Sequence, residues 1–244
     1  MSTNAAPPPA PEGATPAGER KWRPLNSIQR RVLGVLVEKA KTTPEQYPLS
    51  LNGLTTGCNQ KSNRHPQMNL EPDQLEQALD ELRHLGACLE IQSGGRVAKY
   101  KHCLYEWLGV DKVELAVLAE LLLRGEQTVG ELRGRAARME PIADLNALRP
   151  VLCALMDKGL VVELTPEGRG QVVTHALYRP HELDELRTRY REAASARPAA
   201  SEAPRPREDS VDALSELRAE VAELRAELEN LRGQLEELRQ SVLG

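Results

Sequence analysis

Apolar residues recur at helical spacing in two long stretches of the chain, and an alternating pattern typical of strands follows each of them. The first helix is predicted to begin after Asn26, which forms a capping-box pattern with Gln29, and to run to about Lys41. A second, shorter helix is predicted after Ser50, which is a favourable N-cap residue. The chain therefore begins its folded part with two helices joined by a short connection.

A third helix is predicted from Pro72 to the glycine at position 86, because proline suits a first helical turn and glycine a helix end. A β-hairpin is expected over residues 87–104, with its turn at residues 93–96. Three helices followed by a hairpin is the element order of a winged helix.

The same order of patterns returns in the second half of the chain. Asp111 with Glu114 makes another capping box, and Thr128 begins a short helix that is predicted to continue through Met139. A third helix and a second hairpin complete this copy, and Pro150 inside the helix predicts a kink or a later start. The fold class is therefore predicted as mainly α with small β-hairpins, arranged as two tandem winged-helix domains.

The spacing between the two copies changes along the chain. The apolar positions of the first helices match at an offset of 85 residues, whereas those of the third helices and the following strands match at an offset of 73. The first copy therefore holds 12 additional residues between its first and third helices. We expect them in the stretch Thr42–Leu70, which is rich in proline, glycine, asparagine and glutamine.

The polar part of this stretch is the first candidate binding site, because asparagine and arginine side chains suit contacts to base edges and phosphates. Its candidate residues are Asn59, Lys61, Ser62, Asn63, Arg64 and His65. The alternative is that these side chains cap helix ends and close turns, with their hydrogen bonds satisfied locally. If the stretch is functional, removing the additional residues should abolish the function and leave both copies folded.

Two further groups of basic residues are candidates for binding nucleic acid or a partner. They are Arg96, Lys99 and Lys101 in the first hairpin, and Arg133, Arg135 and Arg138 in the second helix of the second copy. For the second group, a solvated helix face is the competing interpretation. The third helix of the first copy carries mostly acidic and amide side chains at its polar positions, and phosphate repulsion opposes its entry into a DNA groove.

Composition limits the possible functions further. Of the 244 residues, 40% are apolar and only 3% are aromatic, which favours two small domains with aliphatic cores. The four cysteines and five histidines form no metal-ligand spacing, and the cysteines are interpreted as small core residues. No nucleophile motif or phosphate-binding loop is present, so we expect no catalytic residue, no metal and no cofactor.

The remaining segments have their own composition. Residues 1–21 are expected to be a disordered tail, 22–108 the first domain, 109–191 the second, 192–210 a Pro/Ala/Ser-rich linker and 211–244 a coiled coil. The sequence shows no secretory signal and no apolar run long enough for a membrane span, so we expect a cytoplasmic protein without membrane contact.

The last segment repeats apolar residues at alternating spacings of three and four over four heptads, which predicts a parallel homodimeric coiled coil. A parallel pair sets Glu220 against Arg225 of the second copy, whereas an antiparallel pair brings like charges together. A trimer, or a helix that packs back on its own core, stays an alternative. The predicted dimerisation residues are Leu214, Leu217, Val221, Leu224, Leu228, Leu231, Leu235, Leu238 and Val242.

Three strings carry a resemblance to a known family: TTPEQYPLSLNGL, CNQKSNRHPQMNL and LLLRGEQTVGELRGRAARM. They are similar to those of the YceH-like family, bacterial proteins of unassigned function built from two winged helices. The resemblance extends from about Leu25 to Tyr178 and includes the C-terminal heptads. It implies the tandem winged-helix fold and implies no mechanism.

Two functional hypotheses follow. The first, which ranks slightly ahead, is a dimeric DNA-associated regulator, which tandem winged helices joined by a coiled coil favour by analogy of fold. The second is a protein–protein adaptor that does not bind DNA, which the acidic third helix favours. In both hypotheses the protein is not an enzyme.

Overall fold

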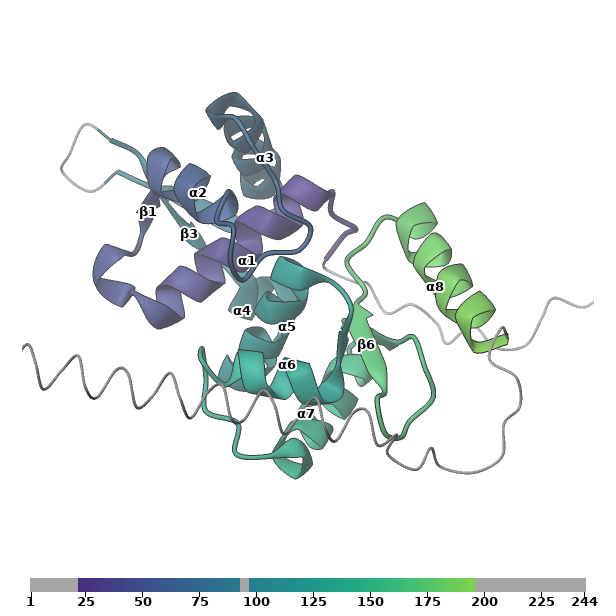
Figure 1. The fold of residues 1–244 in the computed structure, drawn as a ribbon. Helices are drawn as coiled ribbons and strands as arrows, with labels where there is room; N and C mark the ends of the chain where they lie inside the picture. Colours follow the sequence, from purple (N-terminus) through teal and green to yellow (C-terminus); the bar gives the residue numbers. More distant parts are fainter. Residues whose placement is uncertain (1–21, 93–96, 196–244) are drawn as a thin grey trace, which may run out of the picture. The chain divides into compact units, whose positions relative to one another are not determined.

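The computed structural model describes residues 22–92 and 97–195 of the chain. Within these residues the fold is mainly helical, with two small antiparallel sheets (Figure 1). The chain divides into two compact units, residues 1–194 and 195–244, and the elements described below lie in the first unit up to Ala194. The predicted N-terminal tail, the turn at 93–96, nearly all of the linker and the whole predicted coiled coil lie outside the described residues.

The first repeat comprises residues 27–102. Its elements are α1 (Ser27–Thr42), the short 3-10 helix η1 (Pro44–Gln46), β1 (Leu49–Ser50), α2 (Leu51–Cys58), α3 (Pro72–His84), β2 (Cys88–Ile91) and β3 (Lys99–His102). The three strands are antiparallel in the order β1-β3-β2. In this register Leu49 lies opposite Tyr100, and Cys88 lies opposite His102.

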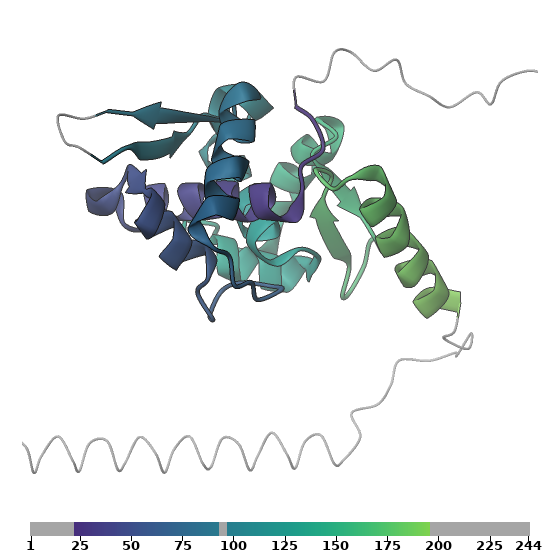
Figure 2. The ribbon, with the colours of Figure 1, turned by 90° about the horizontal axis from the view of Figure 1, so that it is seen from above.

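The second repeat comprises residues 112–175 and follows the short helix α4 (Leu104–Leu108), which the sequence pattern did not predict. Its elements are α5 (Lys112–Arg124), β4 (Gln127–Thr128), α6 (Val129–Ala136), α7 (Leu145–Asp157), β5 (Val161–Glu163) and β6 (Val172–His175). The strand order, β4-β6-β5, matches that of the first repeat. A final helix, α8 (Pro180–Ser195), follows the second repeat and lies beside β6 (Figures 1 and 2).

The helix starts follow the capping patterns in the sequence. Asn26 and Gln29 form a reciprocal capping box at α1, with both backbone-to-side-chain bonds at 2.8–2.9 Å. Equivalent boxes begin α5 at Asp111 and α6 at Thr128, as predicted. Each box satisfies backbone N–H groups that a helix start would otherwise leave without an acceptor.

Two predicted details of the second repeat differ in the structure. Helix α6 ends at Ala136, three residues before the predicted end. Helix α7 begins at Leu145 and continues through Pro150, so the later start is wrong. The Asp144 side chain caps this helix by accepting the Ala147 N–H at 2.8 Å, and the proline removes only one backbone bond, in the second turn.

Helices α1 and α5 form the centre of the described fold and pack against each other more extensively than any other pair of its elements. Both are buried around their whole circumference, α1 from Gln29 to Glu38 and α5 from Glu114 to Leu123. Their close approach occurs at Gly34, where an added Cβ would lie 2.9 Å from the Leu123 side chain. The two repeats therefore share one core.

The 12 additional residues of the first repeat lie in three places. Helix α1 is three residues longer than α5, the connection from α1 to β1 is four residues longer than its counterpart, and the α2–α3 loop (residues 59–71) is five residues longer. Most of the excess therefore lies in the predicted stretch, but as two separate extensions, and the rest lengthens α1.

The repeats also share a motif at the end of their last strands that the sequence comparison did not use. HCLY at residues 102–105 and HALY at residues 175–178 lie at the 73-residue offset. In both, the histidine Nδ1 accepts the backbone N–H two residues later, at 3.4 Å for His102 and 3.2 Å for His175. Burial lowers the pKa of His102 to about 4 and holds the pKa of His175 well below its ordinary value, so both rings are neutral.

Candidate functional site

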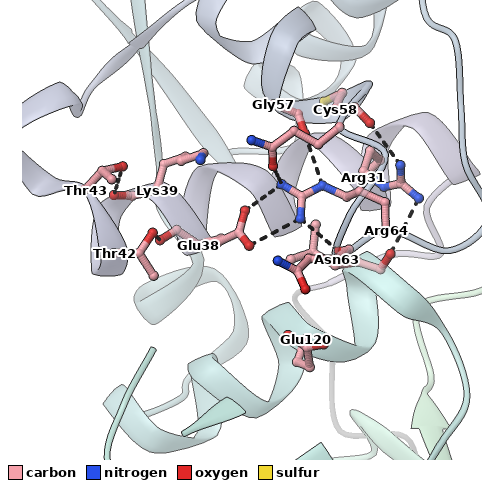
Figure 3. Close-up of polar contacts among 12 residues, drawn as sticks. Arg31, Glu38, Lys39, Thr42, Thr43, Gly57, Cys58, Asn63, Arg64 and Glu120 are labelled. Carbon is pink, nitrogen blue, oxygen red and sulfur yellow. Dashed lines mark hydrogen bonds and ion pairs between the residues drawn. The ribbon is translucent and has the colours of Figure 1, made fainter. Parts of the chain in front are cut away.

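The predicted binding loop carries a buried ion pair at its centre. The Arg64 side chain is fully buried and donates to both carboxylate oxygens of Glu38, at 3.2 and 2.5 Å (Figure 3). It also donates to the backbone oxygen of Gly57 and to the Gln60 side chain. Arg64 therefore joins the loop to α1, and its charge is balanced within the fold by Glu38.

The loop asparagines also bond within the fold. The Asn59 side chain donates to the Leu70 oxygen at 2.9 Å and accepts the Leu70 N–H at 2.7 Å, which closes the loop. Asn63 has a φ of 59°, a left-handed conformation that asparagine tolerates, and its side-chain oxygen accepts from Arg124 at the end of α5 at 2.5 Å. These contacts correspond to the alternative interpretation, in which the amides close turns and link elements.

Arg31 on α1 completes this polar cluster, although the sequence analysis did not select it. It is 1% exposed, and its guanidinium donates to the backbone oxygens of Cys58 and Pro66, at 3.0 and 2.6 Å (Figure 3). The sequence does contain a signal for the burial of Arg31. It lies seven residues before Glu38 on the same helix, and the residues between them are uncharged and apolar. The loop thus supplies a backbone acceptor to Arg31 and the ion-pair partner of Glu38, two of the three charged residues that α1 buries.

Lys61, Ser62 and His65 are the loop candidates that remain exposed. Only backbone atoms of two of them bond in the described structure: the Lys61 oxygen accepts from Gln67, and the His65 N–H donates to the Leu123 oxygen. Their side chains therefore remain candidates for contact with a partner.

The candidates in the first hairpin lie on β3, apart from Arg96, which is outside the described residues. Lys99 and Lys101 are half-buried and, by strand alternation, share the face of the sheet that also carries Leu89. Leu89 is 48% exposed, so this face combines two cations with an exposed apolar side chain.

Two of the three arginines predicted on α6 form ion pairs or hydrogen bonds with other side chains of the fold. Arg135 bonds Gln127 at 2.6 Å and pairs with Glu131 at 3.3 Å, while Arg138 pairs with Glu120 at 3.3 Å. Glu120 is fully buried in α5, and burial raises its pKa although the neighbouring arginines oppose that effect. Arg133 alone of this group has no described partner beyond its own helix.

The outer face of α7 lines a groove of about 690 Å³ in the second repeat. Leu145, 45% exposed, and the exposed Cys153 belong to this face, and Val129 and Met156 add apolar surface. The interpretation of the cysteines as core residues is confirmed for Cys58 and Cys88 and wrong for Cys153. The exposure of Cys153 was indicated in the sequence by the equivalent position of α3, which holds an aspartate, Asp80.

The described residues also bear on metal binding and membrane insertion. They contain no group of three or more histidine, cysteine or acidic side chains placed to hold a metal ion. None of their helices is both long enough and apolar enough to cross a bilayer. The predicted dimerisation residues, Leu214 to Val242, lie outside the described part of the chain.

Comparison with known proteins identifies the family of this chain. Residues 25–170 match the family described as "Protein of unknown function, DUF480". UPF0502 protein RB6530 of Rhodopirellula baltica is 55% identical over 184 residues, which cover 74% of this chain and 77% of that protein. A UPF0502 protein of Geotalea daltonii is 58% identical over 132 residues, 54% of this chain and 61% of its own length. The chain therefore belongs to the DUF480 family of bacterial proteins, whose function is unknown, in agreement with the YceH-like resemblance.

Proposed function

We propose that the protein is a non-enzymatic, cytoplasmic adaptor with two winged-helix repeats, and that its second repeat binds an apolar segment of another protein in the groove on α7. The element order and the strand order of both repeats support the winged-helix assignment. In that fold, α3 and α7 occupy the position of the helix that DNA-binding members insert into the major groove.

The apolar character of the α7 groove carries this proposal. DNA recognition requires cationic and hydrogen-bonding side chains, whereas this helix presents Leu145 and Cys153 at its surface. Arg149 is exposed on the same helix, but it pairs with Glu167 at the groove edge. An apolar centre with a charged rim is the usual composition of a protein–protein interface.

The first repeat points to the same conclusion. The exposed face of α3 carries Asp73, Glu76, Asp80 and Glu81, which repel phosphate. Of the basic residues predicted to bind nucleic acid, Arg64, Arg135 and Arg138 are paired within the fold. The C-terminal heptads add a parallel homodimer to the proposal, so that one molecule would present two grooves.

Site-specific crosslinking with the full chain tests the groove. A photo-crosslinking residue replaces Cys153, and a matched control replaces Asp80, its equivalent on the exposed face of α3. We expect one protein to crosslink at position 153 and not at position 80. That protein, once purified, should bind the Cys153→Asp variant at least about tenfold more weakly, because a buried unpaired charge opposes binding. Equal crosslinking at both positions, or unchanged affinity of the variant, would contradict the proposal.

The second candidate is a DNA-associated regulator. It is favoured by Lys99 and Lys101, two cations on the same face of β3. An anisotropy titration with duplex DNA at about 50 and 200 mM salt separates the two functions, since phosphate contacts weaken steeply with salt. Under the adaptor proposal no binding is expected at low salt. Salt-sensitive binding that is lost in Lys99→Glu/Lys101→Glu would establish the regulator instead.

A further inference from the structure

A second cavity, separate from the α7 groove, lies where both repeats meet α8. Its volume is about 540 Å³, within the range of small-molecule sites. Its walls come from α1, the α2–α3 loop, the end of α5, the chain around His175 and Tyr178, and α8. A ligand in this cavity would therefore touch both repeats and the last helix at once.

Arg31 is the unusual member of this wall. Buried arginines are normally paired with an acid, because an unpaired buried charge is costly. Arg31 is 1% exposed, yet no carboxylate of residues 22–92 and 97–195 lies within ion-pair distance of its guanidinium. Two of its nitrogens donate to backbone oxygens only, and Nε has no acceptor in the described structure.

The neighbouring charges do not neutralise Arg31. Glu38 is a buried acid of the same cluster, but both of its carboxylate oxygens accept from Arg64. Arg31 and Arg64 with one glutamate leave one positive charge inside the fold. Burial, and then the charge of Arg64, lower the pKa of Arg31 to about 10, which still leaves it protonated at neutral pH.

The other arginines of the cavity wall each have an acidic partner. Arg30 forms a two-pronged pair with Glu182, at 2.8 and 2.9 Å, and lies over the ring of Tyr178 at 4.5 Å. Arg124 pairs with Glu120 at 2.8 Å, and Arg189 with Glu126 at 3.6 Å. Glu185 also lines the cavity, but it is exposed on α8 and forms no ion pair with the buried Arg31.

The rest of the wall indicates what kind of anion would fit. Leu122, Leu186, Met68 and Pro66 supply apolar surface, and Tyr178 supplies an aromatic face. His175 is neutral, and because its Nδ1 accepts the Leu177 N–H at 3.2 Å, its proton is on Nε2, a neutral donor. A single uncompensated charge matches a carboxylate, whereas a phosphate would bring about one negative charge too many.

From this arrangement we infer that the cavity binds a small organic monocarboxylate, whose charge Arg31 balances and whose body lies against the apolar wall. The inference is independent of the adaptor proposal, because the cavity and the α7 groove have no lining residue in common. Since the ligand would join α1, the loop, α5 and α8, its binding would also stabilise the junction of the two repeats.

Calorimetric and thermal-shift titrations of the full chain test the inference with benzoate, phenylacetate and hexanoate as probes. Their amides are the matched neutral controls, and inorganic phosphate is the control for a general anion site. We expect at least one carboxylate to bind with a Kd below about 1 mM and its amide at least about tenfold more weakly. No carboxylate binding at about 10 mM, equal binding of the amide, or tighter binding of phosphate would overturn it.

Two variants assign the site. Arg31→Lys keeps the charge and should retain binding, while Arg31→Gln should lose it by at least about tenfold. If Arg31→Gln does not fold, Met68→Trp serves instead, since it fills the cavity from the half-buried loop and leaves Arg31 in place. Arg149→Gln, on the distant groove, is the control and should bind normally. Carboxylate binding that Met68→Trp leaves unchanged would place the ligand elsewhere and refute the inference.

Discussion

The two repeats have the same order of elements but bury different residues at equivalent positions of their central helices. Arg31 and Glu38 of α1 correspond, at the 85-residue offset, to Ala116 and Leu123 of α5. Only the first repeat has the longer α2–α3 loop, and that loop supplies Arg64 and backbone acceptors to these two charges. The longer loop and the buried charges therefore occur together in one repeat, where the loop supplies the partners of these charges.

Arg64→Met should produce the largest change, because it leaves Glu38 buried without a partner. We expect a loss of about 3–5 kcal/mol in the free energy of unfolding, measured by urea denaturation. Adding Glu38→Leu, the residue that α5 has at this position, should recover part of the loss and make the first repeat resemble the second. A loss below about 1 kcal/mol in the single variant would show that the ion pair contributes little.

Gly34→Val tests the shared core and should have the next largest effect. The added side chain would meet Leu123 at 2.9 Å and Leu122 at 3.3 Å, so overpacking should cost about 1–3 kcal/mol in thermal or urea unfolding. Gly134→Ala in α6 is the matched control. Its added Cβ meets nothing within 4 Å, so it should stabilise the protein by about 0.5–1 kcal/mol. Equal effects of the two substitutions would argue against close packing at Gly34.

The paired histidines predict a pH dependence that both repeats share. The pKa of His102 is lowered to about 4 in the folded protein, and that of His175 is also lowered, so the unfolded chain binds more protons in mildly acidic solution. Stability is therefore complete above the ordinary histidine pKa of about 6.5 and falls below it, by about 1 kcal/mol for His102 between pH 7 and 5.5, with a further loss from His175. Urea unfolding at the two pH values measures this loss.

His102→Gln and His175→Gln should each remove part of that pH dependence, and the double variant should remove both parts, whatever their effect at pH 7. A pH dependence that survives in both single variants and in the double variant would show that other groups cause it. The HCLY and HALY motifs would then have the same hydrogen-bond geometry, but their histidines would not cause the pH dependence of stability.

Lys61→Ala should have the smallest effect. Its side chain is exposed, and the described residues offer it no ion pair, so the free energy of unfolding should change by less than about 0.5 kcal/mol. Lys158→Ala in the second repeat should cost more, because the Lys158 Nζ bonds both oxygens of the buried Glu114, at 2.7 and 2.6 Å. If the two variants lose a similar free energy of unfolding, the Lys61 side chain must make a stabilising contact.

Local rules predicted most of the fold. Apolar spacing and capping residues placed the start of α1 after Asn26, the start of α2 after Ser50 and the start of α3 at Pro72, because these signals lie within a few residues of each other. The short helix α4 was missed because five residues carry too little periodicity to recognise.

The site was harder to predict because side-chain pairing depends on contacts that are distant in the sequence. Arg64 suggested an exposed cation in a polar loop, but it meets Glu38, 26 residues away, inside the fold. For the same reason the structure leads us to expect that shortening the loop destabilises the first repeat, contrary to the expectation from the sequence. The α7 groove could not be predicted from the alignment of the two repeats, because the alignment does not show which side chains of α3 and α7 are exposed.

The close packing of α1 on α5 has a consequence for synthesis on the ribosome. Helix α1 emerges early, but the helix that covers the face at Gly34 begins at Lys112, 85 residues after the start of α1. At about 5–20 residues per second, the apolar side of the nascent first repeat stays uncovered for roughly 4–17 s. During that interval it presents an exposed apolar surface that favours aggregation, and the emergence of α5 ends the exposure.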